Sequence, residues 1–442
     1  MSKGKELLKN TAIVSIGKIC TQLITFFLLP VYTAVLSNEE YGVVDLLNTL
    51  TSLLLPIATL QIEQGIFRYL IDCREDKEKQ TTLITTIIRF TIIQTVICIL
   101  IFLCISQFIH NQYKYYLMAN LLMGIFSTIL LQICRGLGDN TKYAIGSFIT
   151  GAITVVLNVL FIVAFHWGAY GMLAATAISN LLCAVYIFIT KKLNKYIEPK
   201  KYDKKVLKEI IKYSVPLIPN MISWWIVSAS DRTIISTVLG VAQNGIYSAA
   251  NKFSGVFNLT WTESASININ SEDKNEFFSR ILDFVLRFFG SLCLGTIAIM
   301  PYVFNILINE KFNDAYFQIP ILIVGSMFNI LVSFLGSVYV AKKLTKEIAK
   351  TSVIAAVINI AVNVVLIKYA ASISTLVAYA LMFIYRWIDV KKYVDFKVNK
   401  ILIMLLILIY SGTIFTYYLK NTTISIIMLL VVVLFAIIIN KN

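Results

Sequence analysis

Long apolar runs separated by short polar breaks follow one another along almost the whole chain. Most runs hold 18 or more residues, which is the length an α-helix needs to cross the hydrocarbon core of a bilayer. The runs are unbroken rather than alternating, which favours helices over the strands of a β-barrel. We therefore predict an all-α, polytopic membrane protein of about 14 transmembrane helices. The predicted spans are 11–36, 42–67, 83–106, 115–137, 143–166, 170–190, 210–239, 242–265, 281–306, 316–341, 350–368, 370–387, 400–419 and 422–439.

The polar breaks between these runs carry most of the positive charge. With the N-terminus in the cytoplasm, 30 of the 39 Lys and Arg residues lie in or beside cytoplasmic segments, and only four lie outside. This asymmetry predicts that both termini are cytoplasmic. The break at 191–212 holds nine lysines and is predicted to be a basic linker on the same side.

Composition agrees with a chain that lies mostly in lipid. Hydrophobic residues make up 58% of the sequence, charged residues only 14%, and the mean hydropathy is +0.78. A soluble protein carries roughly a quarter charged residues, so this chain has too little polar surface to cover a water-soluble globule. The net charge of +15 lies in short loops, where it indicates anionic lipid headgroups rather than nucleic acid.

The two halves of the chain resemble each other in sequence. A shift of 203 residues aligns Leu36–Gly42 with Leu239–Gly245, and a shift of 205 aligns Val155–Asn158 with Ile360–Asn363. Each match joins helices of the same ordinal position, so we predict two six-helix lobes related by a parallel pseudo-two-fold axis, with a polar cavity between them. The predicted divisions are an N-terminal lobe at 1–190, the linker at 191–212, a C-terminal lobe at 213–390 and two additional transmembrane helices at 391–442.

A few ionisable residues lie inside the predicted spans. Each costs roughly 2.5–3.5 kcal/mol at the centre of a membrane helix, so each needs a partner or a wet cavity. Arg232 and Lys252 lie deep in adjacent helices, and Asp231 precedes Arg232. Lys18 and Arg89 lie nearer the cytoplasmic ends. We predict these five residues as the substrate-binding set, while structural ion pairing of Asp231 with Arg232 is the alternative.

The sequence shows no signature of an enzyme. The seven cysteines stand singly, the two histidines match no metal-ligand spacing, and Arg135–Asp139 contains a GxG that follows a membrane helix rather than a strand. We expect no catalytic residues, no bound cofactor and no metal site, and a loop at Arg135–Asp139.

Several short motifs lie along the chain: Phe26–Thr33, Glu40–Gly42 and Gly65–Tyr69 near the start, and Ser230–Ile234 and Gly245–Ser248 in the middle. Together these motifs resemble the polysaccharide transporter family, the Wzx-type flippases of the multidrug, oligosaccharidyl-lipid and polysaccharide exporter superfamily. The resemblance implies alternating-access transport of a polyprenyl-diphosphate-linked oligosaccharide to the outer leaflet of a bacterial cytoplasmic membrane. It also implies a polymerase and glycosyltransferases of the same surface-polysaccharide pathway as partners.

Three other functions stay open at this level. A lipid II flippase also carries an isoprenoid diphosphate, and a multidrug or cation antiporter shares the superfamily. A non-transporting scaffold for assembly of an envelope polymer would explain the helices without a transport path. The first helix offers Lys18 and no acid, which disfavours the antiporter, and the coupling ion is left open between a proton and sodium.

Overall fold

The computed structural model describes residues 28–255, 274–342, 344–366 and 371–441, and these are helical with no β-strand among them. The predicted all-α fold is therefore confirmed. Ten of the described helices are long and apolar enough to cross a membrane, as expected for a multi-pass membrane protein. Parts of the predicted spans at 11–36, 242–265, 350–368 and 370–387 lie outside the described residues.

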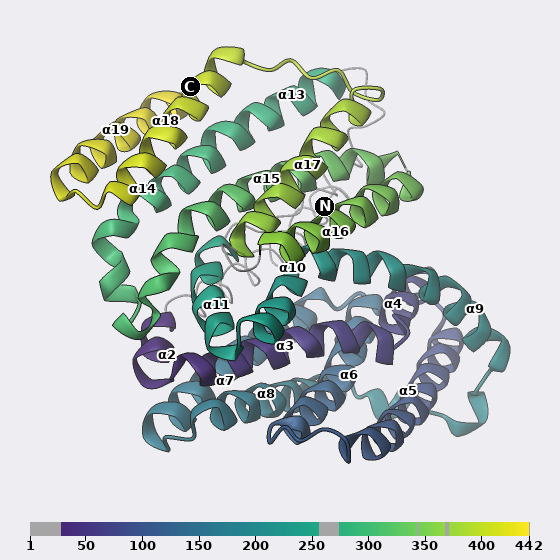
Figure 1. Ribbon diagram of the computed structural model, residues 1–442. Coiled ribbons are helices and arrows are strands. Elements are labelled where there is room, and N and C mark those ends of the chain that lie inside the picture. The colour runs from purple at the N-terminus through teal and green to yellow at the C-terminus, as the bar shows by residue number, and fades with distance from the viewer. Residues whose placement is uncertain (1–27, 256–273, 343, 367–370, 442) are drawn as a thin grey trace. The chain divides into compact units, whose positions relative to one another are not determined.

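The chain forms two compact units, residues 1–222 and 223–442 (Figure 1). The division falls inside α10 (Ile218–Val238), beyond the lysine-rich stretch at 191–212. The four-part division predicted from the sequence stays a prediction.

Helix starts in the N-terminal unit follow from side chains that cap them. At the start of α3, the amide of Glu40 donates to Ser37 Oγ at 3.1 Å, and the amide of Ser37 donates to Glu40 Oε2 at 3.0 Å. This reciprocal pair satisfies amides that have no partner inside the helix. Asp76 and Asp139 cap α5 and α7 in the same position. The helices of this unit are α2 (Leu29–Val35), α3 (Asn38–Ala58), α4 (Ile62–Asp72), α5 (Lys77–Ser106), α6 (Lys114–Gly136), α7 (Asn140–Val159), the π-helix η1 (Leu160–Ala164), α8 (Gly168–Thr190), η2 (Leu193–Tyr196), η3 (Pro199–Lys201), α9 (Lys204–Ser214) and η4 (Val215–Leu217).

The predicted continuous helix at 42–67 is wrong, because the chain unwinds between α3 and α4. Leu60 and Gln61 both adopt left-handed backbone angles, with φ of 53° and 57°. Pro56 inside α3 has no backbone amide to donate to the preceding turn, and just beyond α3 the backbone amide of Gln61 donates to the Pro56 carbonyl, five residues back, at 3.2 Å. Such non-glycine conformations cost on the order of 1–3 kcal/mol each, so the surrounding packing must hold them.

The lysine-rich stretch folds onto the N-terminal unit through α9. Leu207 and Ile210 of α9 are buried in the same hydrophobic cluster as Ile66 of α4. The crossing is close: a Cβ added at Gly65 would lie 2.4 Å from Ser214 Oγ and 2.6 Å from a methyl group of Ile210. The linker is therefore an ordered part of this unit.

The predicted helix at 210–239 is also interrupted. α9 ends at Ser214, a 3-10 turn follows at Val215–Leu217, and α10 begins at Ile218. Pro216 lies in this turn and Pro219 in the first turn of α10, where a missing amide is tolerated.

The C-terminal unit begins within α10 and packs its helices around α15 and α17, which contact each other extensively. α16 packs on α17, and α11 packs on α15. α18 and α19, the last two helices, lie beside α14 and share a buried cluster with it that includes Leu294, Leu406 and Phe435 (Figure 1). The remaining elements are α11 (Val241–Gly255), α13 (Lys274–Phe284), the π-helix η5 (Val285–Phe289), α14 (Gly290–Leu307), η6 (Glu310–Gln318), α15 (Ile319–Ala341), α16 (Thr345–Leu366), α17 (Ala371–Val390), α18 (Lys400–Leu419) and α19 (Thr422–Asn440).

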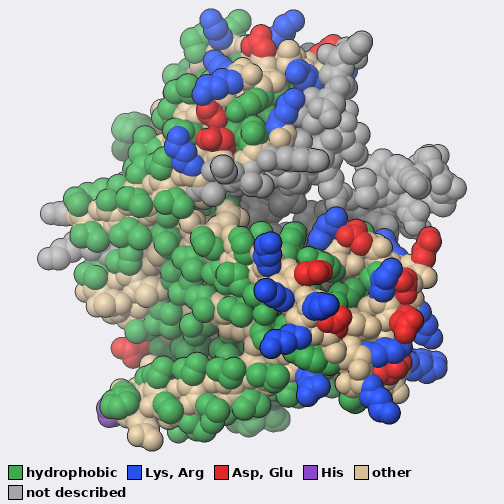
Figure 2. Space-filling view, turned by 90° about the vertical axis from the view of Figure 1, so that its right-hand side faces the viewer, with side chains coloured by type: hydrophobic (Ala, Val, Ile, Leu, Met, Phe, Trp, Pro, Cys, Tyr) green, Lys and Arg blue, Asp and Glu red, His purple; other side chains and the backbone are tan. Residues whose placement is uncertain are grey.

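Hydrophobic side chains cover much of the surface of both units, while Lys and Arg gather in patches (Figure 2). On α5, Ile92, Val96 and Leu100 are each at least half exposed, and α19 presents Leu434 and Ile438 in the same way. A water-soluble protein does not expose apolar surface of this extent, whereas lipid covers it without penalty.

Candidate functional site

A buried carboxylate joins four helices of the C-terminal unit. Asp231 lies in α10 and is only 1% exposed. Tyr247 of α11 donates its hydroxyl to Asp231 Oδ2 at 2.9 Å, and Thr375 of α17 donates to the same oxygen. Asn363 of α16 donates its amide to Asp231 Oδ1, and Ser374 Oγ lies 3.5 Å from that oxygen. The carboxylate thus accepts hydrogen bonds from side chains of three other helices.

A second layer of amides and hydroxyls holds these donors in place. Ser374 donates to Asn363 Oδ1 at 2.8 Å, and Asn363 also donates to Asn359 Oδ1 at 3.3 Å. Ser230, which precedes Asp231, donates to the same Asn359 oxygen at 3.1 Å. Because each donor is itself bonded, the positions of the oxygens around Asp231 are fixed before any ligand arrives. We call Ser230, Asp231, Tyr247, Asn359, Asn363, Ser374 and Thr375 the Asp231 network.

The composition of the Asp231 network limits its chemistry. It offers one carboxylate together with hydroxyl and amide oxygens, which are ligands for a proton or a hard monovalent cation rather than for a transition metal. Among the residues that the structure describes, no group of three or more His, Cys, Asp or Glu side chains could hold a metal ion.

Arg232 follows Asp231 in α10 but points in another direction. Its side chain is half-buried, and its Nη1 donates to the Ser228 carbonyl at 3.1 Å, one turn earlier in the same helix. Lys252, in the last turn of α11, is also half-buried. Both predicted cations therefore belong to the C-terminal unit and keep part of their surface accessible. Their shared contact with one substrate group stays a prediction.

Of the other two predicted cations, Arg89 is among the described residues. Arg89 belongs to the N-terminal unit, where it is exposed and its guanidinium lies 4.9 Å from the centre of the Tyr202 ring. This contact attaches Arg89 to the basic linker. Lys18 lies outside the described residues.

A buried arginine in α17 was missed by the sequence analysis. Arg386 is 1% exposed and donates to Thr351 Oγ1 at 2.9 and 3.1 Å and to the Val332 carbonyl at 2.9 Å. Its guanidinium lies 5.9 Å from the ring of Trp224, a residue in the N-terminal half of α10. The signal was available, because Arg386 stands in an apolar run. Its position near the predicted end of that run made it look interfacial.

The unwound stretch between α3 and α4 gives the N-terminal unit a buried polar site of its own. Thr59, Gln61 and Glu63 are at most 5% exposed. The backbone amide of Gln61 donates to Thr59 Oγ1 at 3.2 Å. Interrupted membrane helices commonly line substrate or ion paths, because their backbone groups need polar partners. The sequence analysis did not place these residues in the candidate site, and Pro56 was the available signal.

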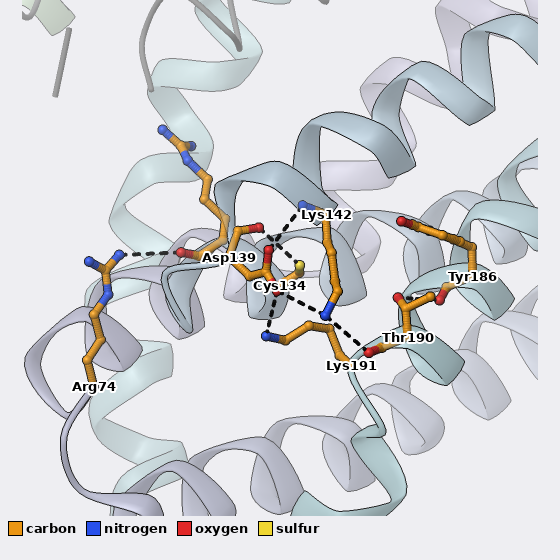
Figure 3. A network of polar contacts seen from close by, with 8 residues as sticks. Arg74, Cys134, Asp139, Lys142, Tyr186, Thr190 and Lys191 are labelled. Carbon is orange, nitrogen blue, oxygen red and sulfur yellow. Dashed lines mark hydrogen bonds and ion pairs between the residues drawn. The ribbon is translucent and has the colours of Figure 1, made fainter. Parts of the chain in front are cut away.

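Asp139 forms a different polar site, at the ends of the N-terminal helices (Figure 3). Lys191 and Lys142 contact Asp139 Oδ2 at 3.0 and 3.2 Å, and the Lys142 amide donates to Oδ1 at 3.1 Å. Arg74 Nε donates to the Gly136 carbonyl at 2.9 Å. Partial burial would raise the pKa of Asp139, but the hydrogen bonds from Lys142 and Lys191 outweigh it and hold the pKa below its ordinary value. The predicted loop at Arg135–Asp139 is confirmed only for Leu137–Asp139, which link α6 to α7, because Arg135 and Gly136 are the last residues of α6.

Solved structures with a similar fold are membrane transporters. The chain is similar to the lipid II flippase MurJ in its inward closed conformation, with a TM-score of 0.71 and 16% identity over 97% of this chain and 98% of that chain. It is similar to a MATE family multidrug resistance transporter of the MOP superfamily in its inward-facing conformation, with a TM-score of 0.63 and 14% identity over 84% and 95% of the two chains. A MOP superfamily transporter from Pyrococcus furiosus matches with a TM-score of 0.57 and 15% identity over 89% and 99%. At these identities the likeness establishes the fold.

The sequence itself matches a family model over more than half its length. The model is described as polysaccharide biosynthesis protein and matches residues 7–266, a range that includes Asp231, Arg232 and Lys252. No curated protein matches the chain. The ten long apolar helices that the structure describes indicate a multi-pass membrane protein. This chain therefore belongs to the polysaccharide biosynthesis protein family.

Proposed function

We propose that the protein moves a polyprenyl-diphosphate-linked oligosaccharide from the inner to the outer leaflet of the bacterial cytoplasmic membrane by alternating access, for surface polysaccharide biosynthesis. In this proposal both termini and the 191–212 linker are cytoplasmic. The family supports a lipid-linked glycan as substrate. The fold, which resembles those of a lipid II flippase and of multidrug resistance transporters, supports translocation.

The observation that carries the proposal is the pair of half-buried cations in the C-terminal unit, one of which, Arg232, directly follows Asp231. A diphosphate that enters the membrane interior must exchange its hydration for cationic or hydrogen-bonding groups. Arg232 offers a planar fork that matches two phosphate oxygens, and Lys252 offers a mobile ammonium group. Both side chains keep accessible surface, as a substrate contact requires.

The Asp231 network provides the site for a coupling ion in this mechanism. A proton or a sodium ion, carried as a second substrate, would neutralise Asp231 and change the balance of charge next to Arg232. Binding of the ion and of the diphosphate would then be linked, because both act on the same region of α10. Coupling to sodium would make the transfer rate depend on the sodium concentration, whereas coupling to protons would make it depend on the pH. Replacing external sodium at constant pH therefore separates the two.

The test uses the purified chain in liposomes that contain a polyprenyl-diphosphate oligosaccharide with a fluorophore on the glycan. A membrane-impermeant quencher reports the fraction that reaches the outer leaflet. We expect Arg232→Ala and Lys252→Ala each to slow transfer by about tenfold or more, since each removes a charged contact of roughly 1.5–3 kcal/mol. Arg280→Ala is the matched control, because Arg280 is an exposed cation on α13 paired with Glu276. Transfer at the wild-type rate by both charge-removing variants would reject the assignment.

A cell-based measurement separates this function from the lipid II alternative. In a strain that lacks the gene, loss of surface polysaccharide with normal cell-wall growth supports the proposal. A lethal loss of cell-wall synthesis, rescued by the wild-type chain, would instead identify a lipid II flippase.

A further inference from the structure

A pocket of about 340 Å³ opens at one end of the C-terminal unit. None of its lining residues belongs to the Asp231 network. The C-terminal end of α14, the η6 segment and the turn between α18 and α19 form its walls. The topology predicted from the charge asymmetry of the chain puts this end outside the cell, where Lys311 and Lys420 are two of the four basic residues. The volume falls within the range of roughly 300–1,000 Å³ that is common for small-molecule sites. The lining residues are Pro301, Tyr302, Phe304, Asn305, Asn313, Asp314, Tyr316, Phe317, Lys420, Thr422 and Ser425.

One wall of this pocket is a rigid aromatic frame. The rings of Tyr316 and Tyr417 stack at 4.2 Å with an angle of 16° between them, and the Tyr417 hydroxyl donates to the Tyr316 carbonyl at 2.7 Å. Tyr418 likewise stacks on Phe317, and its hydroxyl donates to the Phe317 carbonyl at 2.8 Å. These paired contacts fix the η6 segment to the end of α18. The aromatic wall is thus formed in advance of binding, which reduces the entropy lost when a ligand docks.

The other walls supply neutral hydrogen-bonding groups. Asn305 and Asn313 offer amides, and Tyr302, Thr422 and Ser425 offer hydroxyls. Only Asp314 and Lys420 carry charge, and their charges are opposite. Lys420 Nζ also lies 4.5 Å from the centre of the Phe317 ring, which holds its charge against the aromatic wall. The formal charge of the lining side chains is therefore zero, which disfavours a phosphate and favours a neutral ligand that is rich in hydroxyls.

We propose that this pocket binds a neutral sugar residue of a glycan at the outer face of the protein. Aromatic rings fit the apolar face of a sugar ring, and amides with a carboxylate hydrogen-bond its hydroxyls. The inference that this sugar belongs to the transported glycan rests on the function proposed above. The pocket requires the turn between α18 and α19, so the last two helices give the C-terminal unit a sugar site that the preceding helices alone would lack.

The experiment uses the full chain in lipid nanodiscs and saturation-transfer NMR. The probes are the methyl glycosides of glucose, galactose, N-acetylglucosamine and N-acetylgalactosamine, with glycerol phosphate and inorganic phosphate as anionic comparisons. We expect at least one glycoside to bind, and we expect Asp314→Ala and Asn313→Ala to weaken that binding by about tenfold. Glu310→Ala is the matched control, because Glu310 is exposed in the same η6 segment and does not line the pocket.

Three outcomes would overturn the proposal. They are the absence of binding by every glycoside, preferred binding of glycerol phosphate, which would indicate a lipid headgroup, and equal glycoside binding by wild type and Asp314→Ala. None of these depends on transport. Normal transport by the Arg232 and Lys252 variants would reject the proposed function and leave glycoside binding unaffected, so the two proposals fail separately.

Discussion

Asn158 and Asn363 occupy matching positions in the sequence repeat, yet each half gives its asparagine a different partner. In the N-terminal unit, Asn158 donates to the Tyr32 hydroxyl at 2.8 Å. In the C-terminal unit, Asn363 donates to the carboxylate of Asp231. Both asparagines are almost fully buried, at 4% and 0% exposure. The N-terminal unit therefore pairs its buried asparagine with a neutral hydroxyl, whereas the C-terminal unit pairs its buried asparagine with a carboxylate.

This difference shows that folding needs only a polar partner for the buried asparagine, and that the negative charge of Asp231 goes beyond this need. A buried amide needs one polar partner, and a tyrosine hydroxyl is enough in the N-terminal unit. A buried carboxylate costs more than a hydroxyl, because its charge must be stabilised away from water. The C-terminal unit accepts that cost and surrounds Asp231 with donors from three helices. We interpret the acid as a functional feature superimposed on a contact that folding satisfies without charge.

The strongest test of this comparison removes the charge and keeps the shape. Asp231→Asn should reduce transfer of the labelled lipid-linked oligosaccharide by about tenfold or more, because a neutral amide binds neither a proton nor a cation in the same way. Thermal unfolding in detergent should change little, since the amide keeps one acceptor oxygen. Wild-type transfer by Asp231→Asn would show that the charge is structural.

Removal of the asparagine in the C-terminal unit should have the next largest effect. Asn363→Ala leaves Asp231 Oδ1 without its amide donor and should destabilise the protein by about 2 kcal/mol. Transfer should also fall, because the position of the carboxylate is no longer fixed. Calorimetry and the liposome assay on the same preparation measure both effects. A change in stability without a change in transfer would contradict a role for the network in transport.

The matched change in the N-terminal unit should affect folding alone. Asn158→Ala breaks one neutral hydrogen bond and should cost about 1 kcal/mol, with transfer within twofold of wild type. The pair Asn158→Ala and Asn363→Ala is thus a control within one molecule. Equal loss of transfer in both variants would remove the distinction between the two halves.

Substitution of Asp139, an aspartate whose charged partners are lysines, should have the smallest effect. Asp139→Asn keeps the helix cap and loses the ion pairs, so we expect a loss of about 0.5 kcal/mol at pH 7. The pKa of Asp139 lies below its ordinary value, so this stabilisation is complete above the unfolded-state pKa of about 3.9 and disappears as the pH falls through the folded-state pKa. Unfolding temperatures of wild type and variant should therefore converge in acid. A difference that persists there would assign the effect to something other than the charge.

The sequence predicted the helical fold well because lipid imposes a simple rule on composition. Apolar runs must be long and helical, and this property is local. The breaks at 59–61 and 215–217 were harder to foresee. Pro56 lies shortly before the first break and Pro216 lies inside the second, but proline is tolerated in membrane helices and does not by itself predict a break. Leu60 and Gln61 adopt left-handed backbone angles although neither is a glycine, the residue type from which such angles are predicted.

The candidate site was only partly predictable for the opposite reason. Asp231 stood out because a charge in an apolar run is rare. Its partners, Asn363 and Thr375, lie more than 130 residues away and are neutral, so nothing local connects them to it. Asn363 entered the sequence analysis only as a member of the repeat.

The close contact of α9 with α4 at Gly65 has a consequence for how the two halves of this chain can evolve and be engineered. Since α9 is docked, the spacing between the halves is not adjustable along the whole lysine-rich stretch. The stretch before α9 is held as well, because the backbone amides of Glu198 and Asp203 donate to Thr85 Oγ1 and Thr86 Oγ1 of α5 at 3.0 and 3.1 Å. Within α9, an inserted residue would rotate Leu207 and Ile210 away from their cluster by about 100°. A split form of the protein should therefore keep α9 in one piece with the N-terminal unit, where its apolar face is buried.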